Sequence, residues 1–326
     1  MSHPHPSTAP ATLPSASSLS PRCDDVLAVI VTYQPQIDVL RQVLESVAPQ
    51  VGRVLIFDNA TASTAVEALP AFLAQAESDG ASVVRSPTNV GLGAAMNRAA
   101  DHARAAGFAY LLLLDQDSLL EPSMVSTLKL AHEELAASRP VAAVGPQFSD
   151  RRNGHVAPFV EIAFPISRKL FGGPGRRVPC DFLISSGSLM RLDTLERIGG
   201  MDERLFIDNV DLEWCFRARH RGFGLFGICD ARMRHSIGDT VRAAWLKPGG
   251  VMIHKPIRLY YIMRNRVLLY GREETPAVWI AQDLPRLVLK FIGTALFVAP
   301  RPAYLRMMLG GLCDALRGRS GPFPGR

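Results

Sequence analysis

Four apolar runs in the first 115 residues alternate with segments of helical periodicity, and no other feature constrains the fold as strongly. The apolar runs lie at residues 26–34, 53–57, 81–85 and 109–114. The predicted helices lie at residues 36–48, 64–78, 94–106 and from about Pro122 to residue 137. Short buried strands that alternate with helices are typical of a doubly wound, mostly parallel sheet with helices on both faces. The sequence therefore predicts an α/β fold of Rossmann-like type.

The chain divides into three predicted regions. Residues 1–24 are rich in Pro, Ser and Ala, which is typical of a disordered tail, and they lack the pattern of a secretory signal. Residues 25–240 form the α/β domain, and residues 241–326 form a basic, amphipathic helical region. Five scattered cysteines without metal-site spacing favour a reducing compartment such as the cytoplasm.

The strand and helix alternation stops at about residue 145. Beyond it we expect an irregular segment at 150–180, strands at 181–190 and 223–228, and helices at 192–200 and 211–220.

Polar side chains follow the predicted strands at the points where the strands end. These residues are Thr32, Asp58, Asp115 and Asp117. The carboxyl ends of parallel strands meet at one sheet edge, where ligands of such folds bind, so we expect these side chains to gather there. Two carboxylates one residue apart can hold a divalent cation. The alternative for Asp115 and Asp117 is a solvated turn that caps the next helix.

A glycine-containing loop, Asn89 to Gly93, precedes the third predicted helix, and Asn97 follows one turn later. Glycines allow a ligand to approach the backbone, and a helix N-terminus favours phosphate. The loop lacks the Lys-Ser/Thr of a P-loop and the full GxGxxG pattern, which disfavours a nicotinamide-dependent oxidoreductase. The loop by itself is a weak signal.

An acidic cluster, Asp208, Asp211 and Glu213, precedes Arg217 in FIDNVDLEWCFRAR. One of these carboxylates could act as a general base. The alternative is a solvated helix start whose acids pair with Arg217 or favour the helix dipole. His235 follows a predicted strand, and a lone histidine is more often structural than a ligand.

The C-terminal third is strongly basic, because residues 231–326 hold 16 Lys and Arg against 5 Asp and Glu. Basic and aromatic residues alternate at 258–272, which suggests an anionic partner. The acidic motifs argue against nucleic acid, whose phosphates they would repel. The run from Leu287 to Pro300 is too short to span a bilayer, so we expect an in-plane helix. One face of this helix is predicted to carry Leu284, Leu287, Val288, Phe291, Ile292, Ala295 and Leu296. The alternative is a helix that packs on the catalytic domain.

The order of the motifs resembles the inverting family 2 glycosyltransferases of the GT-A fold. The motifs are VTYQP, FDNA, NVGLGAAMN, LLLLDQDS, SSGSLM, LFIDNVDLEWCFRA and RHSIG, and the resemblance covers about residues 26–270. The DQDS, LISSG and LFIDxVDxE forms resemble bacterial rhamnosyltransferases, in particular those that add the second rhamnose in rhamnolipid synthesis.

The resemblance implies a nucleotide-sugar half at residues 25–145 and an acceptor half at 146–240. It places Thr32 and Tyr33 in the base pocket and Asp58 on the pyrimidine. It also implies that Asn89, Gly91 and Asn97 border the donor sugar and diphosphate.

The resemblance further implies that Asp115 and Asp117 hold Mg²⁺ or Mn²⁺, with Asp117 as the likelier direct ligand and His235 as a further one. The position of the family's general base corresponds to Asp211, followed by Glu213 and Arg217 on the donor side. Val210 stands where the commonest family pattern has Glu, which keeps Asp208 as the alternative base.

The function implied by the resemblance is inverting transfer of L-rhamnose from dTDP-L-rhamnose to an amphiphilic lipid or lipid-linked sugar. Mono-rhamnolipid is the first acceptor expected, and an intermediate of O-antigen or other surface polysaccharide is the alternative. A different class would be a non-catalytic protein that binds nucleotide sugars or nucleic acid. We expect a cytoplasmic enzyme that associates peripherally with the cytoplasmic face of the inner membrane, without a nucleic-acid partner.

Overall fold

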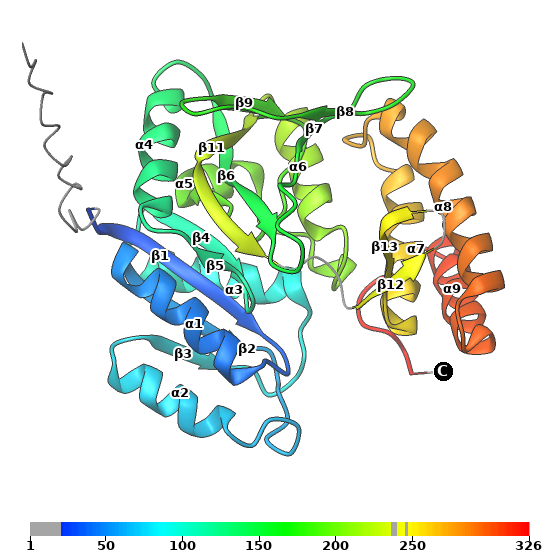
Figure 1. Cartoon of the computed structure of the whole chain (residues 1–326), viewed down its shortest axis with the longest axis horizontal. Helices are drawn as coiled ribbons and strands as arrows, with labels where there is room; N and C mark the ends of the chain where they lie inside the picture. Colours follow the sequence, from blue (N-terminus) through cyan, green and yellow to red (C-terminus); the bar gives the residue numbers. More distant parts are fainter. Residues whose placement is uncertain (1–20, 236–239, 245–246, 326) are drawn as a thin grey trace, which may run out of the picture.

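The computed structural model describes residues 21–235, 240–244 and 247–325, and its centre is a nine-stranded mixed sheet with helices on both faces (Figure 1). The strand order is β3-β2-β1-β4-β10-β6-β11-β5, and β9 pairs with β11. The strands of the N-terminal half are β1 (Cys23–Thr32), β2 (Val51–Asp58), β3 (Ser82–Arg85) and β4 (Tyr110–Asp115), which are all parallel. The predicted parallel core is therefore confirmed.

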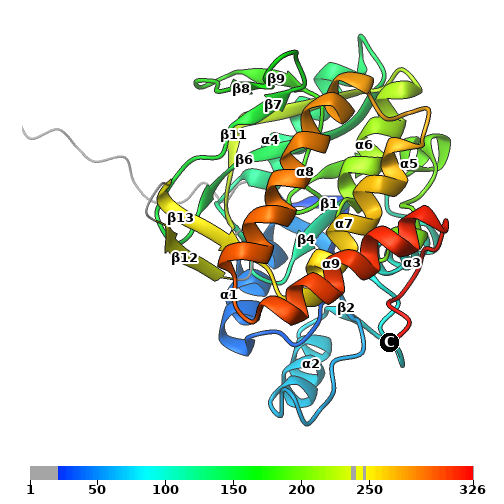
Figure 2. The same cartoon turned by 90° about the vertical axis from the view of Figure 1, so that its right-hand side faces the viewer.

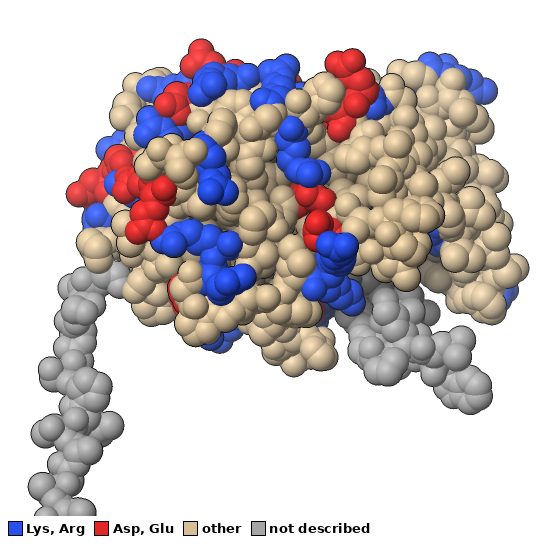
Figure 3. Space-filling model, turned by 90° about the horizontal axis from the view of Figure 1, so that it is seen from above, with Lys and Arg blue, Asp and Glu red and all other residues tan. Residues whose placement is uncertain are grey.

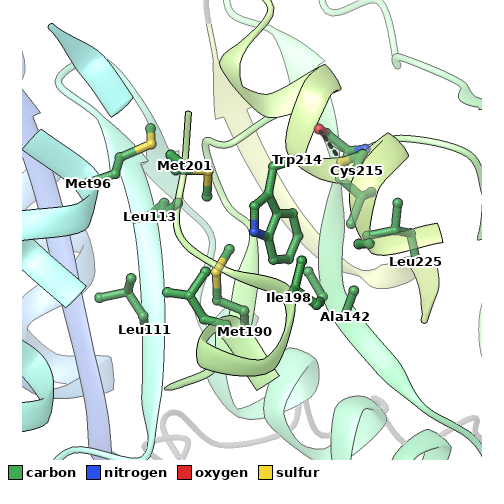
Figure 4. Packing of buried hydrophobic residues seen from close by; sticks show 14 of the residues in the cluster. Met96, Leu111, Leu113, Ala142, Met190, Ile198, Met201, Trp214, Cys215 and Leu225 are labelled. Carbon is green, nitrogen blue, oxygen red and sulfur yellow. Dashed lines mark hydrogen bonds between the residues drawn. The ribbon is translucent and has the colours of Figure 1, made fainter. Parts of the chain in front are cut away.

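Side-chain alternation along these strands builds two separate cores. Leu27, Val29 and Leu113 point to one face, while Ala28 and Ile30 point to the other. The first face is covered by α3 (Leu92–Ala105), α5 (Leu192–Ile198) and α6 (Val210–His220), as the packing around Trp214 in Figure 4 shows. The second face is covered by α1 (Ile37–Val47), α2 (Leu69–Ser78) and α4 (Met124–Ala136). Burial on both faces explains why the strands are continuous apolar runs.

The second half of the sheet is mixed. Strands β6 (Val141–Asp150) and β11 (Gly224–His235) are parallel to each other. Between them and β4 lies the antiparallel β10 (Leu189–Arg191), and the short strands β5 (Leu119–Leu120) and β9 (Arg177–Cys180) pair with β11. A separate hairpin is formed by β7 (Phe159–Glu161) and β8 (Arg168–Leu170).

Several predicted boundaries were wrong. Cys23 and Asp24 belong to β1, so the predicted disordered tail of residues 1–24 is too long, and residues 1–20 lie outside the described residues. The predicted strand at 181–190 is mostly irregular, and only its last two residues belong to β10. The segment 150–180, predicted to be irregular, contains the short strands β7, β8 and β9.

The C-terminal region begins with the hairpin of β12 (Thr240–Ala244) and β13 (Lys247–Ile253) and continues with three helices. The helices are α7 (Pro256–Tyr270), α8 (Ala277–Phe297) and α9 (Arg301–Leu316). Figures 1 and 2 show them stacked on one side of the α/β domain, with α8 outermost. No helix in the described part of the chain is long and apolar enough to cross a membrane.

The basic and aromatic segment at 258–272 does not form the anionic-partner surface that the sequence predicted. Arg264 is fully buried and donates to the carbonyl oxygen of Leu205 at 3.0 Å. Arg272 pairs with the carboxylates of Asp202 at 2.5 Å and Glu213 at 3.3 Å. The cations therefore serve internal carboxylates and carbonyls, because buried charges need partners. Their positive charge compensates acids of the α/β domain.

The predicted apolar face of α8 is divided between the interior and the surface. Leu287 is buried, and Phe291 and Ala295 pack partly against a small core that α8 shares with α7 and α9. The remaining predicted members, Leu284, Val288, Ile292 and Leu296, are exposed. One side of α8 therefore packs on the protein, as the second alternative expected, and the other side is exposed. The in-plane membrane helix stays a prediction.

Asn265 offers a test of how α7 is attached. Its buried side-chain amide donates to the carbonyl oxygens of Leu205, Ile207 and Asp208 at 2.9, 2.8 and 2.8 Å. We expect Asn265→Ala to leave these buried carbonyls without their donor and to lower the free energy of unfolding by about 2–3 kcal/mol.

The matched control is Asn153→Ala in an exposed turn, which should cost less than about 0.5 kcal/mol. Urea denaturation of both variants measures the difference. Equal stabilities of the two variants would contradict the attachment.

Candidate active site

The strand register brings the predicted polar residues to one level of the sheet edge. Thr32 lies opposite Asp58 in the β1–β2 pair, and Val31 lies opposite Asp115 in the β1–β4 pair. The convergence expected from a parallel topology is therefore confirmed for these three strand ends.

The end of β1 and the end of β2 bring together a small group of polar side chains. The hydroxyl of Thr32 is buried and donates to Asp58 Oδ1 at 3.3 Å. The same carboxylate oxygen accepts the N–H of Thr61 at 3.4 Å. The ring of Tyr33 is half exposed beside these groups. This arrangement offers a carboxylate, a hydroxyl and an aromatic surface to a ligand at the sheet edge.

Gln116 joins the strand ends on either side of the site, a role that was not predicted. Its side-chain oxygen accepts the backbone N–H of Tyr33 at 2.8 Å, and its amide nitrogen donates to the carbonyl of Tyr33 at 3.4 Å. Gln116 is the middle residue of the Asp115-Gln116-Asp117 motif, so the residue between two candidate ligands holds the β4 end against the β1 end. Only its position inside the motif signalled a role.

The glycine loop is shaped by contacts within the protein. Gly91 has a φ of +83°, and a Cβ built there would lie 2.6 Å from the carbonyl oxygen of Phe206. Leu92 N–H donates to that same oxygen. Asn89 accepts the N–H of Gly91 at 3.0 Å, and Asn59 accepts the N–H of Val90 at 2.9 Å. Glycine is therefore required at position 91 because the backbone of Phe206 leaves no room for a side chain. The side chain of Asn59 holds this loop in place, a role that was not predicted.

The side chain of Asn97 is engaged in hydrogen bonds within the protein. Its amide nitrogen donates to the carbonyl of Met201 at 3.0 Å and to Glu203 at 2.8 Å, while its oxygen accepts the N–H of Met201 at 2.7 Å. The hydrogen bonds of this side chain fasten α3 to the segment that follows α5. Contact between Asn97 and a donor stays a prediction.

Asp115, Asp117 and His235 form a cluster whose ligand atoms lie within 4.8 Å of one another. His235 Nδ1 is 3.2 Å from Asp117, and Nε2 is 3.8 Å from Asp115. His235 ends β11, so a strand distant in sequence brings the imidazole to the β4 end. Burial alone would lower the pKa of His235, but the hydrogen bond to Asp117 and the charge of Asp115 raise it above its usual value.

Two serines fix the geometry of this cluster and were not predicted. Ser118 Oγ lies 3.0 Å from His235 Nδ1 and 2.6 Å from Ser186 Oγ. Ser186 Oγ in turn accepts the N–H of Asp115 at 3.0 Å. Hydrogen bonds from neighbouring side chains, such as these serine hydroxyls, orient imidazole and carboxylate ligands. Two carboxylates and an imidazole that converge in this way fit a divalent cation.

Asp211 lies in the first turn of α6, where its carboxylate accepts the N–H of Leu212 at 2.8 Å. Burial raises the pKa of Asp211 to about 6 despite that hydrogen bond, and the charges of Asp115 and Asp208 add to the rise. A carboxylate with a pKa close to neutrality is suited to general-base catalysis.

The remaining acids of the cluster have other partners. Asp208 is paired with Arg258 of α7, with the closest contact at 2.5 Å. Glu213 is buried and makes two hydrogen bonds to Arg217, at 2.7 and 2.9 Å. Arg217 also donates to the carbonyls of residues 198–200. The predicted pairing of Arg217 with an acid is therefore confirmed for Glu213, and the charged groups of Glu213 and Arg217 are engaged within the protein.

Comparison with known proteins agrees with this geometry. The model of glycosyl transferase family 2 matches residues 28–199, which is more than half of the chain. The chain is also 28% identical over 303 residues to the dTDP-rhamnosyl transferase RfbF of Shigella flexneri, with 91% of this chain and 97% of the relative covered.

Solved structures show the same fold at low sequence identity. GalNAc-T7 with UDP, GalNAc and Mn²⁺ has a TM-score of 0.57 and 12% identity over 90% of this chain, which spans 56% of that protein. The mannosyltransferase PcManGT from Pyrobaculum calidifontis, in complex with GDP-Man and Mn²⁺, has a TM-score of 0.51 and 14% identity, with 94% of this chain and 79% of that chain covered. The match to the family model shows that the chain belongs to glycosyl transferase family 2, and the solved structures show that it has an α/β fold of the GT-A type.

Proposed function

We propose that this glycosyltransferase transfers L-rhamnose from dTDP-L-rhamnose to a lipid-linked acceptor, with inversion at the anomeric carbon. The observation that carries the proposal is the position of Asp211 next to the cluster of Asp115, Asp117 and His235 at the sheet edge. A base beside a cation site is what direct displacement from a sugar nucleotide needs. The dTDP-rhamnosyl transferase of Shigella flexneri supports the choice of donor.

Asp115, Asp117 and His235 would hold Mg²⁺ or Mn²⁺, and Asp117 is the likelier direct ligand. A cation there would neutralise charge that builds up on the departing diphosphate. Mn²⁺ in the structures of GalNAc-T7 and PcManGT supports the assignment.

Other residues would bind the donor and accept the proton of the acceptor. Thr32, Tyr33 and Asp58 would bind the thymine base, and the loop at Asn89 and Gly91 would border the sugar and the diphosphate. Asp211 would accept the proton of the acceptor hydroxyl. The acceptor oxygen forms its bond to the anomeric carbon while the bond to the diphosphate oxygen breaks, so a β-linked donor gives an α-L-rhamnoside.

The acceptor is proposed to be an amphiphile at the cytoplasmic face of the inner membrane. We place a lipid-linked intermediate of surface-polysaccharide assembly first, because the relative from Shigella flexneri is named a dTDP-rhamnosyl transferase and its name does not refer to rhamnolipid. Mono-rhamnolipid is the second acceptor, on the strength of the DQDS, LISSG and LFIDxVDxE motifs.

Turnover with defined substrates tests the proposal. Purified protein is given dTDP-L-rhamnose, Mg²⁺ or Mn²⁺, and either a polyprenyl-linked glycan or mono-rhamnolipid, and dTDP release and product mass are followed. We expect one rhamnose to be added to one of the two acceptors and the reaction to stop with EDTA. Binding of the donor without product would overturn both proposed acceptors. The absence of both donor binding and turnover would overturn the rhamnose assignment.

Replacement of the base gives a second prediction. Asp211→Asn should lower kcat by about 10²–10⁴-fold, because general-base assistance is lost, while the dissociation constant for dTDP-L-rhamnose stays within about twofold. Asp208→Asn is the matched comparison, since Asp208 is paired with Arg258. If Asp208→Asn loses the activity and Asp211→Asn keeps it, the base is Asp208.

The rate should also depend on pH through Asp211. Only the deprotonated carboxylate can accept a proton, so kcat should rise with pH and level off above the pKa. That pKa is about 6 in the metal-free protein. Burial is the main cause of the raised pKa, and a cation beside Asp115 would remove only the smaller contribution of that carboxylate. The midpoint should therefore fall between about 4 and 6. A rate that is independent of pH from 4 to 7 would contradict the assignment.

A further inference from the structure

The outer surface of α8 and the loop between β7 and β8 expose large apolar side chains that no described residue covers. On α8, Leu289 is 69% exposed and Phe297 is 82% exposed, and Leu284, Val288 and Ile292 form an exposed row at four-residue spacing. Residues four apart lie on one side of a helix. In the loop, Phe164 is 75% exposed and Ile166 is 71% exposed.

The two segments are joined although they lie more than 100 residues apart in sequence. Gln282 of α8 accepts a hydrogen bond from Ser167 Oγ at 2.7 Å and donates to the carbonyl of Ala163. These contacts fix the loop that carries Phe164 and Ile166 against the N-terminal half of α8. We call the exposed apolar residues of α8 and of residues 163–167 the docking face. Large apolar side chains that are exposed together on a protein surface mark an interaction site.

The exposed charges of α8 and α9 are of one sign. Residues 277–316 contain two acids, Asp283 and Asp314, and both are buried. Asp283 pairs with Arg266 at 2.7 Å, and Asp314 accepts from the hydroxyl of Tyr260 at 2.9 Å. The cations Arg286, Arg301 and Arg306 are exposed on the same two helices. Figure 3 shows the C-terminal side of the molecule as mostly uncharged surface with Lys and Arg at its rim.

We propose that the docking face lies in the plane of an anionic lipid bilayer, with its apolar side chains at the acyl boundary and its arginines among the headgroups. An exposed apolar helix face with basic residues beside it is the pattern that binds such a surface. A second copy of the chain fits less well, because a twofold contact through this face would bring the same arginines together. The proposal rests on the proposed amphiphilic acceptor for its purpose but not for its geometry.

Vesicle co-sedimentation of the full-length protein tests the proposal without donor or acceptor. We expect the wild-type chain to pellet with vesicles of phosphatidylglycerol and phosphatidylethanolamine, and to bind pure phosphatidylcholine more weakly. The double variant Leu289→Glu, Phe297→Glu should bind vesicles about tenfold or more weakly, because two exposed apolar side chains that would enter the bilayer are replaced by charges that the headgroups repel. Ile166→Glu should weaken binding through the separate loop.

Leu130→Glu is the matched control, because Leu130 is 57% exposed on α4 of the α/β domain. It should bind vesicles as the wild type does. Thermal melts confirm that each variant is folded.

Failure of the wild type to bind vesicles would overturn the proposal, and so would normal binding by a docking-face variant. A wild type that is dimeric and does not bind vesicles, with a monomeric double variant, would show that the face contacts a second copy instead. Vesicle binding by a protein that does not use dTDP-L-rhamnose would retain the docking face and overturn only the proposed function.

Discussion

The geometry of the candidate active site depends on the attachment of α7 to the segment that precedes Asp211, the proposed base. Phe206, Asp208 and Asn209 have φ values between +63° and +67°, a conformation that side chains other than glycine rarely adopt. The carbonyls of this segment accept from Asn265 and Arg264, and the Asp208 carboxylate is held by Arg258. These contacts compensate the unfavourable backbone and set where α6 begins. The C-terminal region is thereby part of the catalytic domain's construction, although it lies beyond the match to the family model.

Electrostatic compensation is uneven across the site, and this difference separates structural acids from chemical ones. Glu213 and Asp202 lie among arginines, and the arginine partners lower the pKa of Asp202 to about 2 against the effect of burial. Burial and neighbouring acids instead raise the pKa values of Asp115 and Asp211. At Asp115 the charges of His235 and Arg258 oppose this rise without cancelling it. Carboxylates with raised pKa values favour a metal ion or a proton, which separates Asp115 and Asp211 from the arginine-paired acids that hold the fold.

Sequence patterns predicted the parts of the structure that depend on local periodicity and topology. The parallel core follows from apolar runs such as residues 26–34, and the gathering of Thr32, Asp58 and Asp115 follows from strand direction. The patterns could not predict the partners of a side chain. Asn97 and Gly91 match a donor-binding motif, yet their contacts are with Met201 and Phe206, because tertiary neighbours far away in sequence decide them. Ser118 and Ser186 lie in the DQDS and LISSG motifs, but the motifs did not indicate their hydrogen-bond partners for the same reason.

The positive charge of the C-terminal third shows why composition alone cannot identify a partner. Arg258, Arg264 and Arg272 point inward to the acids and carbonyls of the α/β domain, whereas Arg286, Arg301 and Arg306 are exposed. Only the second group can meet an external anion. Inward pairing also requires α7 to pack tightly, and α8, which lies outside it, buries only one side. The packing of α7 against the α/β domain thus buries the arginines of α7 and leaves one side of α8 exposed. Through α7, the segment before Asp211 is connected to the docking face.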